Sequence, residues 1–297
     1  MRTIIMNTNN VVNDGQNNKL VYKFPNSVLF KDSYITLSSA QMYYSWFNIS
    51  SKLGNNIFYY AWRNALGGST NYIVNIPDGL YEISTLNQLL QFEFISNGHY
   101  LVNSTGENVY YAEFIVNPSR YAVQINTYLF PTSLPAGFTN PAGVPFPPQT
   151  YNPVINFPAK INQIFGYIPN FSTDFNTNNA FAPPASSIYV SKTAGGTLSY
   201  ISTTAPNVQP NSNVILTLSN IDNQYASPTG VCYTIIPSVG FGEVINERPP
   251  EFIWNKLIPG TYNQLTLSLL GTDLQPIIIG DPNMTFIFAI KEGIMGN

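Results

Sequence analysis

The sequence predicts an all-β protein: a single eight-stranded antiparallel jelly roll with a helix-containing insertion. Two runs near the C-terminus, Leu265–Leu269 and Met284–Ile290, alternate apolar and polar residues, which is typical of a half-buried strand. A third apolar run, Pro276–Ile279, lies between them. Pro-Gly, Gly-Thr-Asp and Gly-Asp-Pro-Asn, all turn formers, separate the runs. These observations favour antiparallel strands joined by turns.

The same pattern recurs along the rest of the chain. We predict strands that start at Tyr34, Ile57, Asn71, Ser187, Val214, Val231, Leu265 and Met284. Eight antiparallel strands with long connections fit two four-stranded sheets packed face to face.

Changes in composition divide the chain into four segments. Residues 1–19 are interpreted as an N-terminal arm, because Asn7–Lys19 is Asn-rich and has too few apolar residues to pack. It is either a disordered tail or an arm that orders on a neighbouring subunit. Residues 20–77 form the first part of the jelly roll, and residues 186–297 form the second part.

Residues 78–185 are predicted to form the insertion domain. One helix begins near Ser84 or Thr85 and stops at Asn97-Gly98, and a second, Ala159–Phe165, stops at Gly166. Further features are strands over Tyr110–Val116 and Tyr121–Leu129 and a Pro-rich tract from Pro131 to Pro158.

The composition has few charges and many aromatic residues. Charged residues make up 9%, against roughly 25% in a typical soluble domain, and aromatic residues make up 14%, with 20 Tyr. Interface cores are depleted in charge and enriched in aromatic residues, so we expect an obligate assembly. An AT-rich genome would also enrich Asn, Tyr, Phe and Ile.

The same totals argue against nucleic-acid binding, a disulfide framework and a membrane span. The net charge is -3 and no run of Lys and Arg exists, so direct binding of nucleic acid is not expected. A single cysteine excludes an intrachain disulfide framework. The first residues contain too short an apolar run for a signal peptide, and no segment approaches 18 apolar residues. We therefore expect a soluble protein without a membrane span, assembled inside a cell.

We predict no catalytic, metal or cofactor-binding residue. His99, the only histidine, follows a turn, and no local motif provides the acid and nucleophile of a hydrolase triad. Cys232 lies inside the apolar run Val231–Ile236 and is interpreted as a buried core residue. With one His and one Cys, a zinc site of nitrogen and sulfur ligands is excluded.

The carboxylates offer two weaker candidates. Glu243, Glu247 and Glu251 cluster in sequence, as do Asp78 and Glu82, and a glycosidase needs two facing carboxylates. The simpler interpretation pairs Glu247 with Arg248 and assigns the cluster to turns. Asp281-Pro282-Asn283 could offer oxygens to calcium, but a β-turn is the simpler interpretation. Gly67-Gly68 and Gly195-Gly196 are interpreted as turns, and the glycosylation sequons at Asn48, Asn103, Asn170 and Asn283 as chance matches.

A resemblance to a known family emerges at the C-terminal quarter. The segment Phe241–Leu257, followed by Gly260–Asn263, Leu269–Pro276 and Asp281–Ile290, resembles the penton (minor capsid) proteins of virophages and polinton-like viruses, most of all those on the Mavirus side. Val28–Asn48, Pro77–Leu90 and Phe165–Tyr167 are also similar.

The resemblance implies a structural, non-enzymatic capsid protein of the virion. Five copies would form a homopentamer at the icosahedral fivefold vertex, among trimers of a double-jelly-roll major capsid protein, with the insertion facing outward. A receptor on the host or helper virus would be a further partner; the chain lacks the Arg-Gly-Asp motif of adenovirus pentons. The alternative is a non-catalytic glycan- or receptor-binding β-sandwich of a virion surface.

Overall fold

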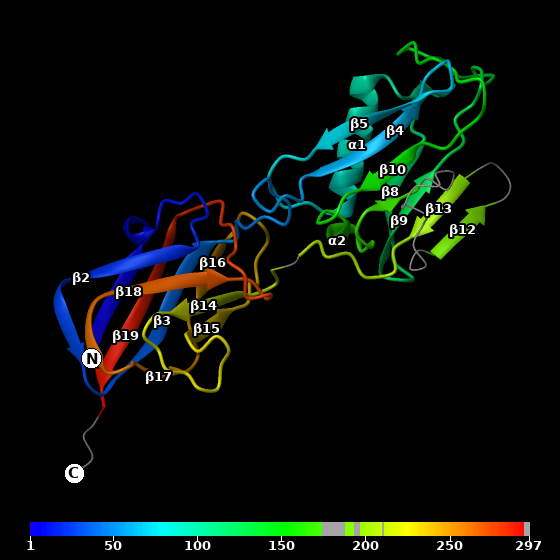
Figure 1. The fold of residues 1–297 in the computed structure, drawn as a ribbon. Coiled ribbons are helices and arrows are strands. Elements are labelled where there is room, and N and C mark those ends of the chain that lie inside the picture. The colour runs from blue at the N-terminus through cyan, green and yellow to red at the C-terminus, as the bar shows by residue number, and fades with distance from the viewer. Residues whose placement is uncertain (174–187, 193–196, 210, 294–297) are drawn as a thin grey trace. The chain divides into compact units, whose positions relative to one another are not determined.

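The computed structural model describes residues 1–173, 188–192, 197–209 and 211–293. The chain forms two compact units (Figure 1). Unit 1 consists of Met1–Phe47 and Gln209–Asn297, and unit 2 consists of Asn48–Val208.

Unit 1 contains two antiparallel sheets. The first has the order β1-β19-β3-β16, and the second has the order β2-β18-β14-β15. A short strand, β17, continues the edge that β16 forms along β3. The strands are β1 (Arg2–Asn7), β2 (Lys19–Phe30), β3 (Ser33–Tyr43), β14 (Val214–Leu218), β15 (Val231–Ile235), β16 (Val244–Glu247), β17 (Asn255–Lys256), β18 (Gly260–Leu270) and β19 (Met284–Glu292).

The pairing within unit 1 is nested. The first strand pairs with the last, β1 with β19, and the second strand pairs with the one before the last, β2 with β18. β3 then pairs with β19, and β14 pairs with β18. This pattern of a long hairpin wound upon itself is a jelly roll. The predicted all-β, antiparallel jelly roll is confirmed.

Alternating side chains form the core between the two sheets. Leu265, Leu267 and Leu269 on β18 are buried, as are Phe286 and Phe288 on β19. The residues between them, Thr266 and Ser268 on β18 and Ile287 on β19, lie on the outer faces, because successive side chains of a strand point to opposite faces. The third apolar run, Pro276–Ile279, forms only isolated bridges, although Ile277 and Ile279 are buried.

The expected N-terminal arm over residues 1–19 is wrong. Arg2–Asn7 is strand β1, whose Ile4 and Met6 are buried in the core. A 3₁₀ turn, η1 (Thr8–Asn10), follows it. The Asn-rich connection is ordered by its own amides: Asn17 Nδ2 donates to Ile279 O at 2.9 Å, and Asn18 Nδ2 donates to Ile277 O at 2.7 Å. Amides that bond to backbone carbonyls replace the apolar contacts that this segment lacks.

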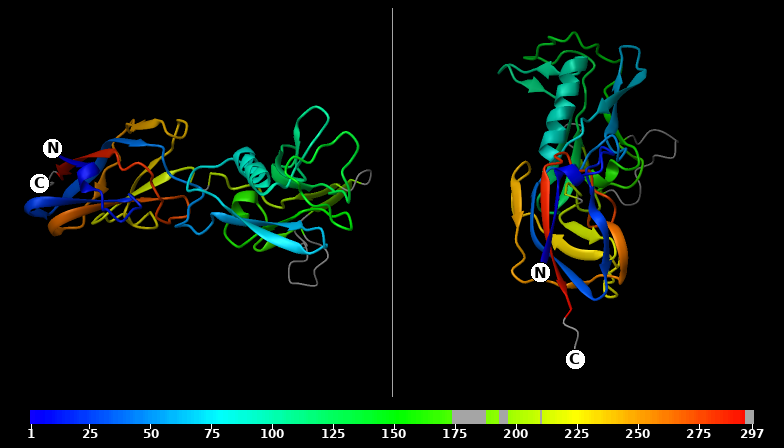
Figure 2. Two further views of the ribbon diagram at one scale, coloured as in Figure 1. Left: turned by 90° about the horizontal axis from the view of Figure 1, so that it is seen from above. Right: turned by 90° about the vertical axis from the view of Figure 1, so that its left-hand side faces the viewer.

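Unit 2 contains two further four-stranded sheets, ordered β11-β10-β4-β5 and β12-β13-β9-β8, and a hairpin, β6-β7. Its elements are β4 (Ile57–Arg63), β5 (Ser69–Asn75), α1 (Ile83–Asn97), β6 (Leu101–Val102), β7 (Asn108–Val109), β8 (Ala112–Asn117), β9 (Ala122–Thr127), β10 (Val154–Phe157), α2 (Asn162–Phe165), β11 (Phe171–Ser172), β12 (Ile188–Lys192) and β13 (Thr197–Ile201). Figure 2 shows two further views of these elements.

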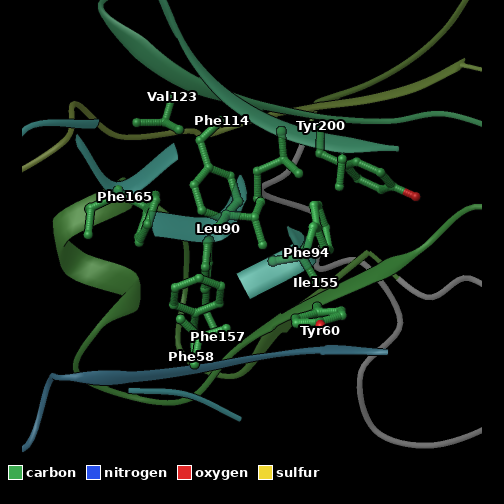
Figure 3. Close-up of a cluster of buried hydrophobic side chains, with 14 of the residues drawn as sticks. Phe58, Tyr60, Leu90, Phe94, Phe114, Val123, Ile155, Phe157, Phe165 and Tyr200 are labelled. Atoms are coloured by element: carbon green, nitrogen blue, oxygen red, sulfur yellow. The ribbon is translucent and has the colours of Figure 1, made fainter. Parts of the chain in front are cut away.

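Aromatic rings dominate the core of unit 2 (Figure 3). The ring of Phe58 meets Phe114 and Phe157 edge-on, at centroid distances of 5.7 and 5.9 Å. Phe94 of α1 meets Tyr60 at 4.9 Å in a T-shaped arrangement. Such pairs contribute beyond the burial of their area, so the rings join α1 to β4, and β4 to β8 of the other sheet.

Unit 2 covers a longer stretch of the chain, Asn48–Val208, than the insertion expected over residues 78–185. β4 and β5, expected to belong to the jelly roll, lie in unit 2 because β4 pairs with β10 and its buried rings pack on Phe94 and Phe157. β12, the strand expected from Ser187, is also in unit 2, and Ser187 itself lies outside the described residues. The jelly-roll positions of these strands are filled by β1, β2 and β16.

Both predicted helices are present, and each ends at the predicted glycine. α1 is followed by Gly98 (φ 72°), whose N–H caps the helix by donating to Ile95 O and Phe94 O. α2 is followed by Gly166 (φ 74°). Glycine adopts this left-handed conformation without a steric penalty. A side chain at Gly166 would in addition collide with the carbonyl oxygen of Thr204.

The two ends of unit 2 are joined by one buried amide. Asn48 Nδ2 donates to Val208 O and to Tyr81 O, both at 2.8 Å, and Tyr81 N–H donates to Asn48 Oδ1 at 2.9 Å. Asn48 and Val208 are the first and last residues of the unit. A buried amide with satisfied donors and acceptor therefore holds the entering and leaving chain side by side.

We predict that Asn48→Ala lowers the free energy of unfolding by about 3 kcal/mol, because the substitution leaves the buried N–H and C=O partners unpaired. Urea unfolding followed by fluorescence measures the change. Asn71→Ala is the control: Asn71 is an exposed residue of unit 2, and its substitution is expected to change stability by less than about 0.5 kcal/mol. Equal effects of the two substitutions would contradict this role of Asn48.

Candidate functional site

Two of the clustered glutamates serve as turn and strand acceptors. Glu243 Oε2 accepts from Gly240 N–H at 2.8 Å, and Glu247 Oε1 accepts from Tyr233 O–H at 2.7 Å. The expected pair of Glu247 with Arg248 is absent from the ion pairs between described residues, which are Arg2–Glu292 and Lys256–Asp32. The Tyr233–Glu247 bond instead links β15 to β16.

The remaining polar candidates also stabilise loops. Asp281 Oδ1 accepts from the backbone and side-chain nitrogens of Asn283, which is the geometry of a turn. Asp78 accepts from Ser51 N–H and Ser50 O–H, and these hydrogen bonds, the backbone one first, lower the pKa of Asp78. No group of three potential metal ligands occurs in the described part of the chain. Gly195-Gly196 lies outside it.

His99, which follows a turn as the sequence indicates, is buried in the core of unit 2. The side chain is only 5% exposed and stacks on Trp62, with ring centroids 4.4 Å apart and 9° between the planes. Its Nδ1 lies 3.0 Å from the hydroxyl of Tyr60. Burial lowers the pKa of His99 to about 4, because the aromatic surroundings do not solvate an imidazolium.

We predict that acid weakens unit 2 through His99. The folded-state pKa of His99 lies below its unfolded value of 6.5, so the unfolded chain binds more protons and stability falls as the pH drops from 6.5 towards 4. The loss at pH 5 is about 2 kcal/mol relative to pH 7.5. Urea unfolding at both pH values measures it. His99→Phe should remove this part of the pH dependence; an unchanged dependence in the variant would contradict the assignment.

Cys232 is a core residue, as the sequence indicates. It is 6% exposed, and its Sγ donates to Leu216 O at 3.3 Å. Burial raises the pKa of the Cys232 thiol to about 12, so the reactive thiolate is scarce at neutral pH.

The native protein should therefore resist iodoacetamide at pH 8, whereas protein unfolded in guanidinium should be labelled at one site. Mass spectrometry counts the added groups. Rapid labelling of the native protein would mean that β15 opens readily or that the thiol is activated.

The edges of the jelly roll form the candidate assembly surface. One edge, formed by β1 and β2, exposes Ile5 and Leu29, which are 51% and 57% accessible. The opposite edge, formed by β15, β16 and the segment 248–254 that separates β16 from β17, exposes Phe252 and Ile253, which are 48% and 58% accessible. We call these the first edge and the second edge.

The outer face between the two edges carries little charge. The registers place Ile5 beside Ile287 and Ile287 beside Ser39, and they place Thr285 beside Gln41 and Gln41 beside Asn246. Lys291 lies towards one end of this face, and its Nζ is 4.2 Å from the centre of the Trp254 ring. Sparse charge beside exposed apolar groups is typical of a surface that another protein covers.

The segment that resembles penton proteins forms most of the second edge. Phe241–Leu257 contains β16, the separating segment and β17, together with Phe241, whose ring contacts Tyr44. The sequence could not reveal that this segment lies at an edge, because that follows from its pairing with β3 on one side only.

Comparison with protein-family models and with curated proteins finds no match. Among solved structures, the chain is similar to the mavirus penton protein, with 10% identity over 99% of this chain and 100% of that chain and a TM-score of 0.40. It is also similar to a chain of the Sputnik virophage structure, with 10% identity over 98% and 97% of the two chains and a TM-score of 0.36. At this identity, no residue roles pass from either structure to this chain.

None of the described helices has the length and apolar character needed to cross a bilayer.

Proposed function

We propose that this protein is a structural, non-enzymatic capsid protein of a virion, and that copies of it join edge to edge in a ring. The observation that carries the proposal is the second edge, where Phe252 and Ile253 project from the segment that resembles penton proteins. Adjacent exposed apolar side chains at a sheet edge, in a chain with 9% charged residues, are typical of a surface that a partner covers.

Two different edges favour a ring rather than a twofold dimer. A twofold dimer joins identical patches, whereas a ring joins two different patches of the same subunit. Here Ile5 and Leu29 lie on the first edge, and Phe252 and Ile253 lie on the second. Joining the edges also removes the unpaired backbone groups that edge strands otherwise present to other chains.

The number of copies and their place come from the sequence resemblance. It supports a homopentamer that closes the fivefold vertex and contacts a double-jelly-roll major capsid protein. An acidic shell component with no basic run also suits a role apart from genome packaging.

Native mass spectrometry of the purified full chain tests the ring. The chain has a mass of 33.0 kDa, and a species of five chain masses is expected. We predict that the double substitution Phe252→Glu and Ile253→Asp weakens association at least about thirtyfold, because it places charges in a desolvated contact. The matched control, Leu66→Glu, changes a residue of unit 2 that is 92% exposed and should leave the ring intact.

The thermal midpoint of the monomeric variant checks its folding, since both substituted residues are solvent-exposed in unit 1. A wild-type protein that remains monomeric at every concentration would refute the ring. A variant that associates as strongly as the wild type would refute the second edge as the contact.

A further inference from the structure

A polar hollow opens on unit 2. It has a volume of about 800 Å³, which lies in the range of small-molecule sites. Its floor is the outer face of the sheet β11-β10-β4-β5, and the loop 149–152 together with Leu129 and Leu198 forms further lining.

The strand registers order the side chains of the floor in rows. Ser172, Asn156 and Tyr59 are neighbours in the first row. Val154, Ala61 and Asn71 form the second, and Arg63 and Ser69 form the third. Residues directly opposite each other in paired strands share a face of the sheet. Ala61, the smallest of these side chains, therefore lies at the centre and leaves the space open.

The lining is rich in neutral hydrogen-bonding groups. Amides and hydroxyls come from Tyr59, Asn71, Gln149, Thr150, Asn156 and Asn170. These groups both donate and accept, as the hydroxyl groups of a sugar do. None of the described lining residues is a carboxylate, and Arg63 is the one charged residue among them.

Arg63 is positioned by Tyr151, and no described carboxylate forms an ion pair with its guanidinium. Its backbone N–H donates to the Tyr151 hydroxyl at 3.1 Å, and its guanidinium carbon lies 5.4 Å from the centre of the Tyr151 ring. Burial raises the pKa of Tyr151, so this phenol remains neutral. Neither ion pair in the described part of the chain involves Arg63. A positioned guanidinium in a hollow whose described lining contains no carboxylate is suited to bind a carboxylate.

We propose that this hollow binds an acidic saccharide, with Arg63 on the sugar carboxylate, the amides on the hydroxyl groups and Tyr59 as an apolar contact for the ring. The carboxylate can belong to a sialic acid or to a uronic acid, since both present the same group. This binding is separate from ring formation, because the hollow lies in unit 2 and the proposed ring contact lies in unit 1.

Isothermal titration calorimetry on the full-length protein tests the proposal with three probes: 3′-sialyllactose, digalacturonate and neutral lactose. At least one acidic probe should bind at least about tenfold more tightly than lactose, and the two acidic probes decide between the sources of the carboxylate. Arg63→Gln should remove this preference. Ala61→Leu, which fills the centre of the floor, should abolish binding of every probe.

Arg120→Gln is the matched control, because Arg120 is an exposed residue of unit 2 that does not line the hollow. The variants should keep the thermal midpoint of the wild type, since the substituted side chains lie on the outer face. Lack of binding by both acidic probes, equal binding of lactose, or an unaltered preference in Arg63→Gln would overturn the proposal. Loss of the ring in the edge variant, together with retained saccharide binding, would support both proposals. Because the two tests measure different properties at different sites, either proposal can fail while the other stands.

Discussion

The jelly roll depends on unit 2 returning the chain to the place where it left. β3 and β14 belong to different sheets, and about 170 residues separate them in sequence. As a flexible loop, such a segment opposes the pairing of β16 with β3 and of β18 with β2 through its closure entropy. The buried amide of Asn48 shortens the effective loop to the few residues on either side of unit 2. By the logarithmic dependence on loop length, this lowers the cost by about 2.5 kcal/mol.

A second clamp lies in unit 1, where Trp46 Nε1 donates to Asn211 O at 2.9 Å. Trp46 and Asn211 come from the leaving and returning chain of that unit. In each unit, a side-chain donor and a backbone acceptor thus join the two chain segments that lead to the other unit. These two hydrogen bonds fix where the chain leaves unit 1 and where it returns. β3 and β14 can therefore keep their registers, although a whole folded unit connects them.

Alternation of apolar residues correctly indicated β18 and β19, and glycines correctly indicated the ends of α1 and α2. Alternation identifies a strand but not its partner, because the pattern is the same in either sheet. Alternation alone therefore predicts β4 and β5 in the jelly roll, whereas their rings pack within unit 2. β1 is not recognised from the sequence because its apolar residues, Ile4–Met6, are consecutive rather than alternating. It also precedes an Asn-rich segment whose order comes from hydrogen bonds to distant carbonyls. The hollow could not be predicted either, since β5, β10 and β11 meet there only after folding.

The nearness of Asn48 to Val208 has a consequence for how such a chain can diversify. The jelly roll requires only that the two ends of the inserted unit lie together, and it places no demand on what lies between them. Unit 2 is in this sense a cassette. Its surface can be altered, or the whole unit exchanged for another with adjacent termini, while the strands and edges of unit 1 remain the same.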